Sequence, residues 1–178
     1  MSADPARRHL VLVGLMGAGK TTVGERCATR LGRPFVDTDD LVTTRTGRTV
    51  ADLFAEGEAT FRAVERDAVA DACASPAPLV IACGGGAVLD PDSRRRLRSV
   101  GFVVWLRAAP QVLADRVQRD PVERPLLARE GRLGTLTRLA ATRAPAYDAA
   151  ADVTVTTEGR SPDEVAAAVL EELDRCAA

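Results

Sequence analysis

The sequence contains few aromatic residues and a single histidine. One Trp, one Tyr and four Phe are scattered along 178 residues, so no aromatic cluster is available on which bases could stack. This composition disfavours a protein that binds single-stranded nucleic acid. His9 lies where the first predicted strand begins, a position that argues against a catalytic histidine.

Neither sign of charge is in excess. The chain has 24 Lys and Arg residues against 25 Asp and Glu residues, which gives a formal net charge of −1. Without a basic excess, no broad positive field attracts nucleic acid or an anionic membrane surface. We therefore expect neither nucleic acid nor a membrane as a partner.

Long apolar runs and cysteine motifs are also lacking. No apolar run is long enough to span a bilayer, and the N-terminal residues lack the apolar core of a signal peptide. The cysteines show neither CxxC spacing nor an accompanying histidine cluster, which disfavours structural zinc and a disulfide framework. We expect reduced, mostly buried thiols in a cytoplasmic protein. The cysteines are Cys27, Cys73, Cys83 and Cys176.

The clearest motif is a glycine-rich segment between a predicted strand and a predicted helix. The segment GLMGAGKT occupies residues 14–21, directly after the apolar run 10–13. In such a P-loop, backbone N–H groups and the helix N-terminus bind phosphates. We expect Lys20 to reach the β- and γ-phosphates and the Thr21 hydroxyl to bind Mg²⁺. The predicted nucleotide contacts here are Gly17, Ala18, Gly19, Lys20, Thr21 and Thr22.

Apolar strands alternate with helices along the whole chain. The predicted strands are near residues 10–13, 35–36, 79–83, 102–106 and 153–156. Helices are predicted after the P-loop, from about 41 toward 47, over 50–74 with a break near Glu56-Gly57, around 94–98, over 110–119 and 135–149, and after the capping box 161–164. This alternation predicts an α/β fold in one domain, residues 1–178, with a five-stranded parallel sheet and helices on both faces.

Two acidic residues follow the second predicted strand. Asp37 and Asp39 lie two positions apart, so in extended chain their carboxylates would share one side of the backbone. One would then face the metal through water and the other an acceptor hydroxyl. Alternatively, they are N-cap residues of the next helix. Because ligands of parallel sheets bind at the carboxyl ends of the strands, the P-loop, this acidic pair and Gly84-Gly85-Gly86 should converge on one cleft.

Three arginines could neutralise anionic groups of a substrate. Residues 120–132 hold two prolines and many charges, so we expect a mobile loop, from which Arg124 would reach the phosphates while closure excludes water. Arg62 lies on a predicted helix with Glu65 one turn further on, and Arg143 begins the segment Arg143-x-Pro-x-Tyr147. Taken singly, each could instead be a surface charge or a structural ion pair.

Together these motifs resemble the shikimate kinase family. The match covers the P-loop, Asp37-x-Asp39, the segment 61–65, the triple glycine, residues 124–127 and residues 143–147, in order along nearly the whole chain. The resemblance implies a monomer with a three-layer P-loop kinase fold, a lid over about 116–132 and substrate-binding helices over about 38–74. It also implies transfer of the γ-phosphate of ATP to the 3-hydroxyl of shikimate, with Mg²⁺.

The resemblance further implies a role for each site residue. Lys20, Asp39 and Arg124 would be catalytic, and Thr21 and Asp37 would support Mg²⁺. The residues implied to contact shikimate are Asp39, Arg62, Gly84, Gly85, Gly86 and Arg143, with Glu65 supporting Arg62. The implied nucleotide contacts outside the P-loop are Arg116, Arg124 and Pro162.

Two alternatives remain from the sequence. A gluconate-type kinase shares the P-loop and an acidic pair, although the triple glycine and the arginines favour a small ring carboxylate. A nucleotide-dependent switch would have no phosphoryl acceptor. Such switches usually carry an acid at the end of the third strand, where this chain has Cys83.

Overall fold

The computed structural model describes residues 8–120 and 131–177, and their strands form one parallel sheet. The strands are β1 (His9–Val13), β2 (Phe35–Asp37), β3 (Val80–Ala82), β4 (Gly101–Arg107) and β5 (Val153–Thr156), in the spatial order β2-β3-β1-β4-β5. β1 lies at the centre and pairs with β3 on one side and β4 on the other. The predicted five-stranded parallel sheet is therefore confirmed.

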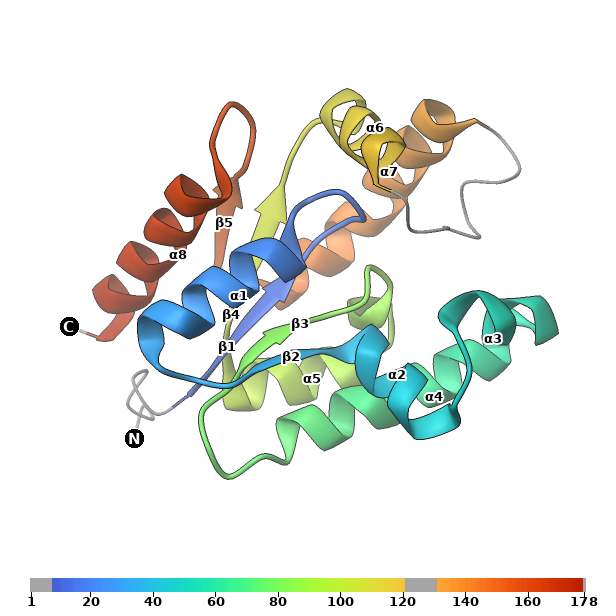
Figure 1. Cartoon of the computed structure of the whole chain (residues 1–178), viewed down its shortest axis with the longest axis horizontal. Helices are drawn as coiled ribbons and strands as arrows, with labels where there is room; N and C mark the ends of the chain where they lie inside the picture. The colour runs from blue at the N-terminus through green and yellow to red at the C-terminus, as the bar shows by residue number, and fades with distance from the viewer. Residues whose placement is uncertain (1–7, 121–130, 178) are drawn as a thin grey trace.

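Helices cover both faces of this sheet. They are α1 (Lys20–Leu31), α2 (Thr38–Thr46), α3 (Val50–Glu56), α4 (Glu58–Cys73), α5 (Pro91–Val100), α6 (Pro110–Arg119), α7 (Arg132–Ala150) and α8 (Pro162–Ala177), with a 3₁₀ turn, η2, at Ala87–Leu89. Figure 1 shows α1 and α8 side by side on one face, with α5 on the other. No helix in the described ranges is long and apolar enough to cross a membrane.

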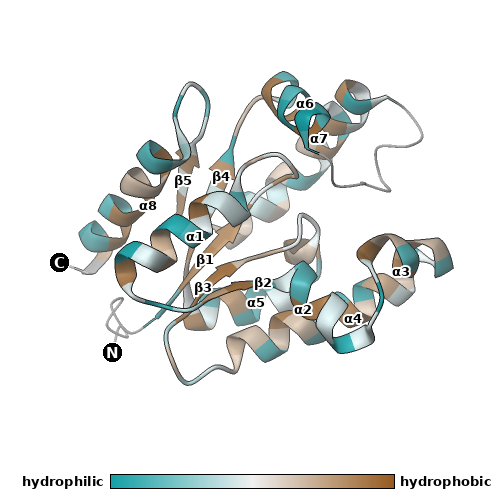
Figure 2. Ribbon diagram, viewed as in Figure 1, coloured by the Kyte–Doolittle hydropathy of each residue, from teal (hydrophilic) through white to brown (hydrophobic). Residues whose placement is uncertain are grey.

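The main core lies on both sides of β1. All five residues of this strand are buried, and Figure 2 shows the apolar colouring concentrated on the central strands. A strand that is covered on both faces is mostly apolar, which explains the hydrophobic run at residues 10–13 that follows His9. The ends of the strands differ from the prediction: the third is shorter, and the fourth extends to Arg107, which pairs with Thr156 of β5.

A second, smaller core holds α2, α3 and α4 together. It consists of Val42, Leu53, Phe61 and Ala68. The predicted break falls at Gly57, whose φ of 148° lies in the region that favours glycine. These helices follow β2 directly and project from the carboxyl end of the sheet (Figure 1), so they can contribute side chains to a site there.

Candidate active site

A cavity of about 790 Å³ opens among the P-loop, the start of α2, α4 and the triple glycine after β3. Every predicted site residue that the structure describes lines it, whereas Arg124 and most of the predicted lid lie outside the described residues. The predicted residues in the lining are Gly17, Ala18, Gly19, Lys20, Thr21, Thr22, Asp37, Asp39, Arg62, Gly84, Gly85, Gly86, Arg116, Arg143 and Pro162.

The P-loop has the backbone shape that phosphate binding requires. Gly17 and Gly19 have φ angles of 79° and 93°, and a Cβ on Gly17 would lie 2.9 Å from a methyl group of Val117. α1 begins at Lys20, so its N-terminal N–H groups face the cavity. The Lys20 ammonium donates to the carbonyl oxygens of Gly14 at 2.9 Å and Leu15 at 3.0 Å, which holds it at the loop.

The two residues predicted to support Mg²⁺ are in contact. The Thr21 hydroxyl donates to Asp37 Oδ2 at 2.9 Å. Mg²⁺ in nucleotide sites binds one or two protein oxygens and completes its shell with phosphates and water. A hydroxyl and a carboxylate beside the P-loop are therefore a suitable donor set for Mg²⁺.

The predicted geometry of the acidic pair is wrong. β2 ends at Asp37 and α2 begins at Thr38, so Asp39 lies in the first helical turn instead of in extended chain. Asp37 is the N-cap of α2, because its Oδ1 accepts from the Asp39 N–H at 2.9 Å. The capping alternative holds for Asp37, and both side chains still line the cavity.

Asp39 is a half-buried residue of the cavity lining, and the pKa of its carboxyl group is raised. Burial, and after it the neighbouring carboxylates of Asp37 and Glu65, raise its pKa to about 6, while Lys20 opposes them. In the described part of the chain, Asp39 Oδ1 and Glu65 Oε1 are buried without a hydrogen-bond partner. Both lie 2.7 Å from the position that a Cβ on Gly84 would occupy, so a side chain at Gly84 would collide with them. These oxygens are acceptors suited to a hydroxyl donor.

This pKa predicts a pH dependence of activity. As the pH falls through about 6, Asp39 takes up a proton and can no longer accept one, so kcat/KM for shikimate should fall about tenfold for each further pH unit. Glu65 also has a raised pKa, because burial outweighs the opposing charge of Arg62. The measurement is a profile from pH 5 to 8. A flat profile down to pH 5 would contradict the assigned ionisation.

Arg62 is held at the cavity wall by several interactions. Its Nη1 lies 2.6 Å from Glu65 Oε2 and its Nη2 lies 3.1 Å from Glu58 Oε1. The guanidinium carbon lies 5.7 Å and 5.2 Å from the ring centroids of Phe54 and Phe61, within cation–π range. This confirms the predicted contact between Arg62 and Glu65. The sequence analysis did not identify Phe54, which also lines the cavity.

Arg143 reaches the cavity from α7 on the other side of the triple glycine. It is only 6% exposed, and its Nη1 donates to the Gly85 carbonyl oxygen at 2.9 Å. A Cβ on Gly86 would overlap the guanidinium of Arg62. The triple glycine therefore lets two arginines that are far apart in the sequence approach the same segment of backbone.

At the far end of the cavity, Arg116 joins the P-loop to the segment after β5. It donates to the hydroxyl and the carbonyl oxygen of Thr157, each at 2.8 Å, and to Gly17 O at 3.3 Å. Thr157 and Arg160 also line the cavity, but the sequence analysis did not identify them as site residues. Arg160 lies between the end of β5 and the predicted capping box 161–164. Because ligands of parallel sheets bind at the carboxyl ends of the strands, this position could have indicated a site residue.

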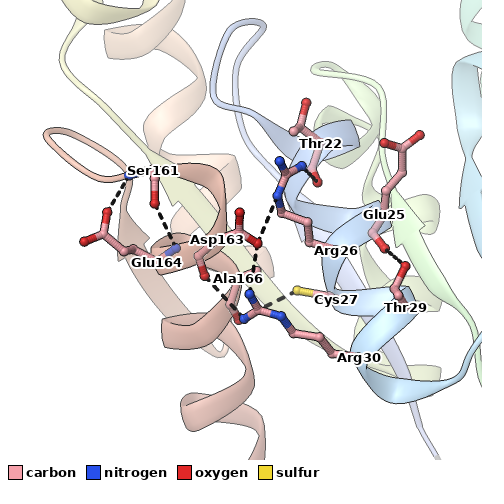
Figure 3. Close-up of polar contacts among 10 residues, drawn as sticks. All are labelled: Thr22, Glu25, Arg26, Cys27, Thr29, Arg30, Ser161, Asp163, Glu164 and Ala166. Atoms are coloured by element: carbon pink, nitrogen blue, oxygen red, sulfur yellow. Dashed lines mark hydrogen bonds and ion pairs between the residues drawn. The ribbon is translucent and has the colours of Figure 1, made fainter.

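Ion pairs connect the start of α8 to α1, as Figure 3 shows. Asp163 Oδ1 lies 3.2 Å from Arg26 Nε and 3.0 Å from Arg30 Nη2. The predicted capping box is present, with reciprocal hydrogen bonds between Ser161 and Glu164. These contacts position Pro162 on the cavity wall beside the helix that begins in the P-loop.

The fold and this cavity define a class of protein. A parallel sheet with a P-loop, a Mg²⁺-compatible pair, and a carboxylate and two arginines that line the same cavity is the arrangement of a P-loop kinase that acts on a small anionic acceptor.

Comparisons with known proteins identify the family. The shikimate kinase family model matches residues 16–174. The shikimate kinase of Symbiobacterium thermophilum is 53% identical over 167 residues, covering 93% of this chain and 95% of that protein, and the one of Dechloromonas aromatica is 45% identical over 150 residues, covering 84% and 81%. The chain belongs to the shikimate kinase family. Like other members, it uses ATP and Mg²⁺ and phosphorylates the 3-hydroxyl of shikimate.

Solved structures agree with this assignment. Shikimate kinase from Acinetobacter baumannii in complex with shikimate superposes with a TM-score of 0.90 at 35% identity, covering 95% of this chain and 94% of that one. A gluconokinase from Sinorhizobium meliloti gives a TM-score of 0.66 at 21% identity, with 96% and 94% covered. At that identity the likeness is one of fold alone.

Proposed function

We propose that the two ends of the cavity divide the reaction between them. The P-loop end holds the triphosphate, with Lys20 at the β- and γ-phosphates. The other end holds shikimate, with its carboxylate gripped by Arg62 and Arg143. Asp39 lies between the two ends and faces the acceptor hydroxyl.

The observation that supports this division is that both sets of residues line the same cavity. Lys20 and Thr21 come from one end of the chain's first helix, whereas Arg62 and Arg143 come from α4 and α7. A planar guanidinium can give a carboxylate two parallel hydrogen bonds, and two such groups on opposite walls would fix the ring. This orientation turns the acceptor hydroxyl toward Asp39.

Asp39 supplies the proton acceptor. A secondary alcohol is far less acidic than a carboxylic acid, so Asp39 need not remove the proton in advance. It orients the hydroxyl and accepts the proton late, as the bond to phosphorus forms. Its raised pKa makes it a better acceptor than an ordinary aspartate, since proton affinity rises with pKa.

The remaining residues neutralise and shield charge. Mg²⁺, held by Thr21 and Asp37, would neutralise charge on the phosphates when bound. The positive charge of Lys20 would also neutralise charge on the β- and γ-phosphates. This proposal also includes Arg124 as the lid arginine at the phosphates. It includes Arg116 and Pro162 as the residues that contact the nucleotide base.

The experiment is a coupled ADP-release assay with shikimate, with gluconate and with no acceptor. Shikimate should produce ADP, whereas gluconate and the blank should give at most a low background. Arg143→Gln should raise the KM for shikimate because the clamp loses one side. ADP release that does not depend on shikimate would contradict the proposed site, as would an unchanged KM in Arg143→Gln.

We also propose that the chain works as a monomer in the cytoplasm. All residues of the proposed clamp come from one chain, and free thiols at Cys27, Cys73, Cys83 and Cys176 suit a reducing compartment. Sedimentation velocity with and without shikimate tests the first part. A dimer at assay concentrations would overturn it.

A further inference from the structure

Tyr147, the chain's single tyrosine, is a buried side chain for which the mechanism so far has no role. It lies on α7, is 1% exposed and stacks on Trp105 with ring centroids 5.4 Å apart. Its hydroxyl donates to the carbonyl oxygen of Gly85 at 2.5 Å. Burial raises the pKa of Tyr147 to about 12, so the hydroxyl keeps its proton and remains a donor at neutral pH.

The same carbonyl oxygen accepts from Arg143 Nη1 at 2.9 Å. Arg143 and Tyr147 lie four residues apart on one face of α7, so both reach Gly85 from the same helix. A carbonyl oxygen has two lone pairs, and these two donors use both. The Gly85 peptide in the middle of the triple glycine is therefore fixed against α7 at two points.

We propose that Tyr147 is a positioning residue for the shikimate carboxylate, acting through Gly85 and Arg143. This inference rests on the proposed function, in which Arg143 grips that carboxylate. A guanidinium has five N–H donors. With the Tyr147 hydroxyl on one lone pair of Gly85 O, Arg143 has room for one hydrogen bond there and presents its other donors to the cavity.

Without the hydroxyl, two changes follow. The Gly85 carbonyl oxygen is left with an unfilled lone pair in a partly buried place, and Arg143 can rotate to give it a second N–H. Donors that turn toward Gly85 are lost to the carboxylate. The peptide also loses one of its two fixed points, so the wall that faces the ring becomes less well defined.

Tyr147→Phe tests this, because it removes the hydroxyl and keeps the ring and its stacking on Trp105. The KM for shikimate should rise about three- to tenfold, the range expected when one hydrogen bond is lost, while the KM for ATP stays within about twofold. The control is Val169→Ala, which removes two methyl groups from the buried core on α8. It should lower the melting temperature and leave both KM values unchanged.

Both variants are assayed at a temperature at which circular dichroism shows them to be folded. An unchanged KM for shikimate in Tyr147→Phe would overturn the inference, as would equal rises in both KM values. Arg143→Gln separates this from failure of the proposed function. If Arg143→Gln raises the KM and Tyr147→Phe does not, only the positioning role is wrong; if neither raises it, the clamp itself is wrong. In the double variant that combines Arg143→Gln with Tyr147→Phe, loss of the hydroxyl should change the KM for shikimate little beyond the effect of Arg143→Gln alone, because the hydroxyl acts through Arg143.

Discussion

Asp39→Asn is expected to lower kcat by about 10²- to 10⁴-fold while the KM for ATP changes by less than about twofold. The amide keeps the size of the side chain but cannot accept a proton. Asp39 lines the same cavity as the P-loop and the arginines. In the proposed function it faces the acceptor hydroxyl, so its loss should affect the reacting hydroxyl more than nucleotide binding. Steady-state kinetics with each substrate varied in turn measures both quantities.

The same change should not destabilise the protein. The rise in the pKa of Asp39 from 3.8 to about 6 corresponds to about 3 kcal/mol of unfolding free energy, present below the unfolded pKa and lost as the pH rises through 6. A neutral amide avoids this cost of a buried charge at pH 7. Denaturant unfolding should therefore show Asp39→Asn to be at least as stable as the parent.

The matched control is Asp174→Asn on α8, where the side chain is exposed. It should leave kcat unchanged. If Asp39→Asn kept kcat within about threefold of the parent, or about 0.65 kcal/mol, Asp39 would not be the proton acceptor.

Arg62→Lys is expected to weaken shikimate binding by about 10- to 100-fold. Hydrogen bonds to charged groups contribute about 1.5–3 kcal/mol, and a single ammonium cannot reproduce a two-pronged contact with a carboxylate. The shorter head group also gives up the two-carboxylate pairing with Glu58 and Glu65. Isothermal titration with shikimate measures the dissociation constant directly.

Arg45→Lys serves as the control for this substitution. Arg45 also pairs with two carboxylates, Asp67 and Asp71, but its side chain is 46% exposed and does not line the cavity. Such exposed ion pairs contribute little to the free energy of unfolding. Because Arg45 also lies outside the cavity, the affinity for shikimate should be unchanged in Arg45→Lys. An unchanged affinity in Arg62→Lys would remove Arg62 from the carboxylate clamp.

The parts of the site that were predictable are those built from adjacent residues. The P-loop combines glycines, a lysine and a threonine in one turn, and the capping box at Ser161 closes within four residues. Local chemistry determines both. The acidic pair was mispredicted because two local preferences compete there: strand pairing of β2 ends at Asp37, and the same carboxylate caps α2.

The sequence by itself determined the fold class and the kind of ligand, because continuous apolar strands alternating with helices have few ways to be buried, and the P-loop shapes its own phosphate site. Only the tertiary structure decided which distant groups share a cavity. Arg62 and Arg143 are brought to the same glycine segment by the packing of α4 and α7. The raised pKa of Asp39 and the contact between Tyr147 and Gly85 arise from burial and long-range packing, which no local pattern encodes.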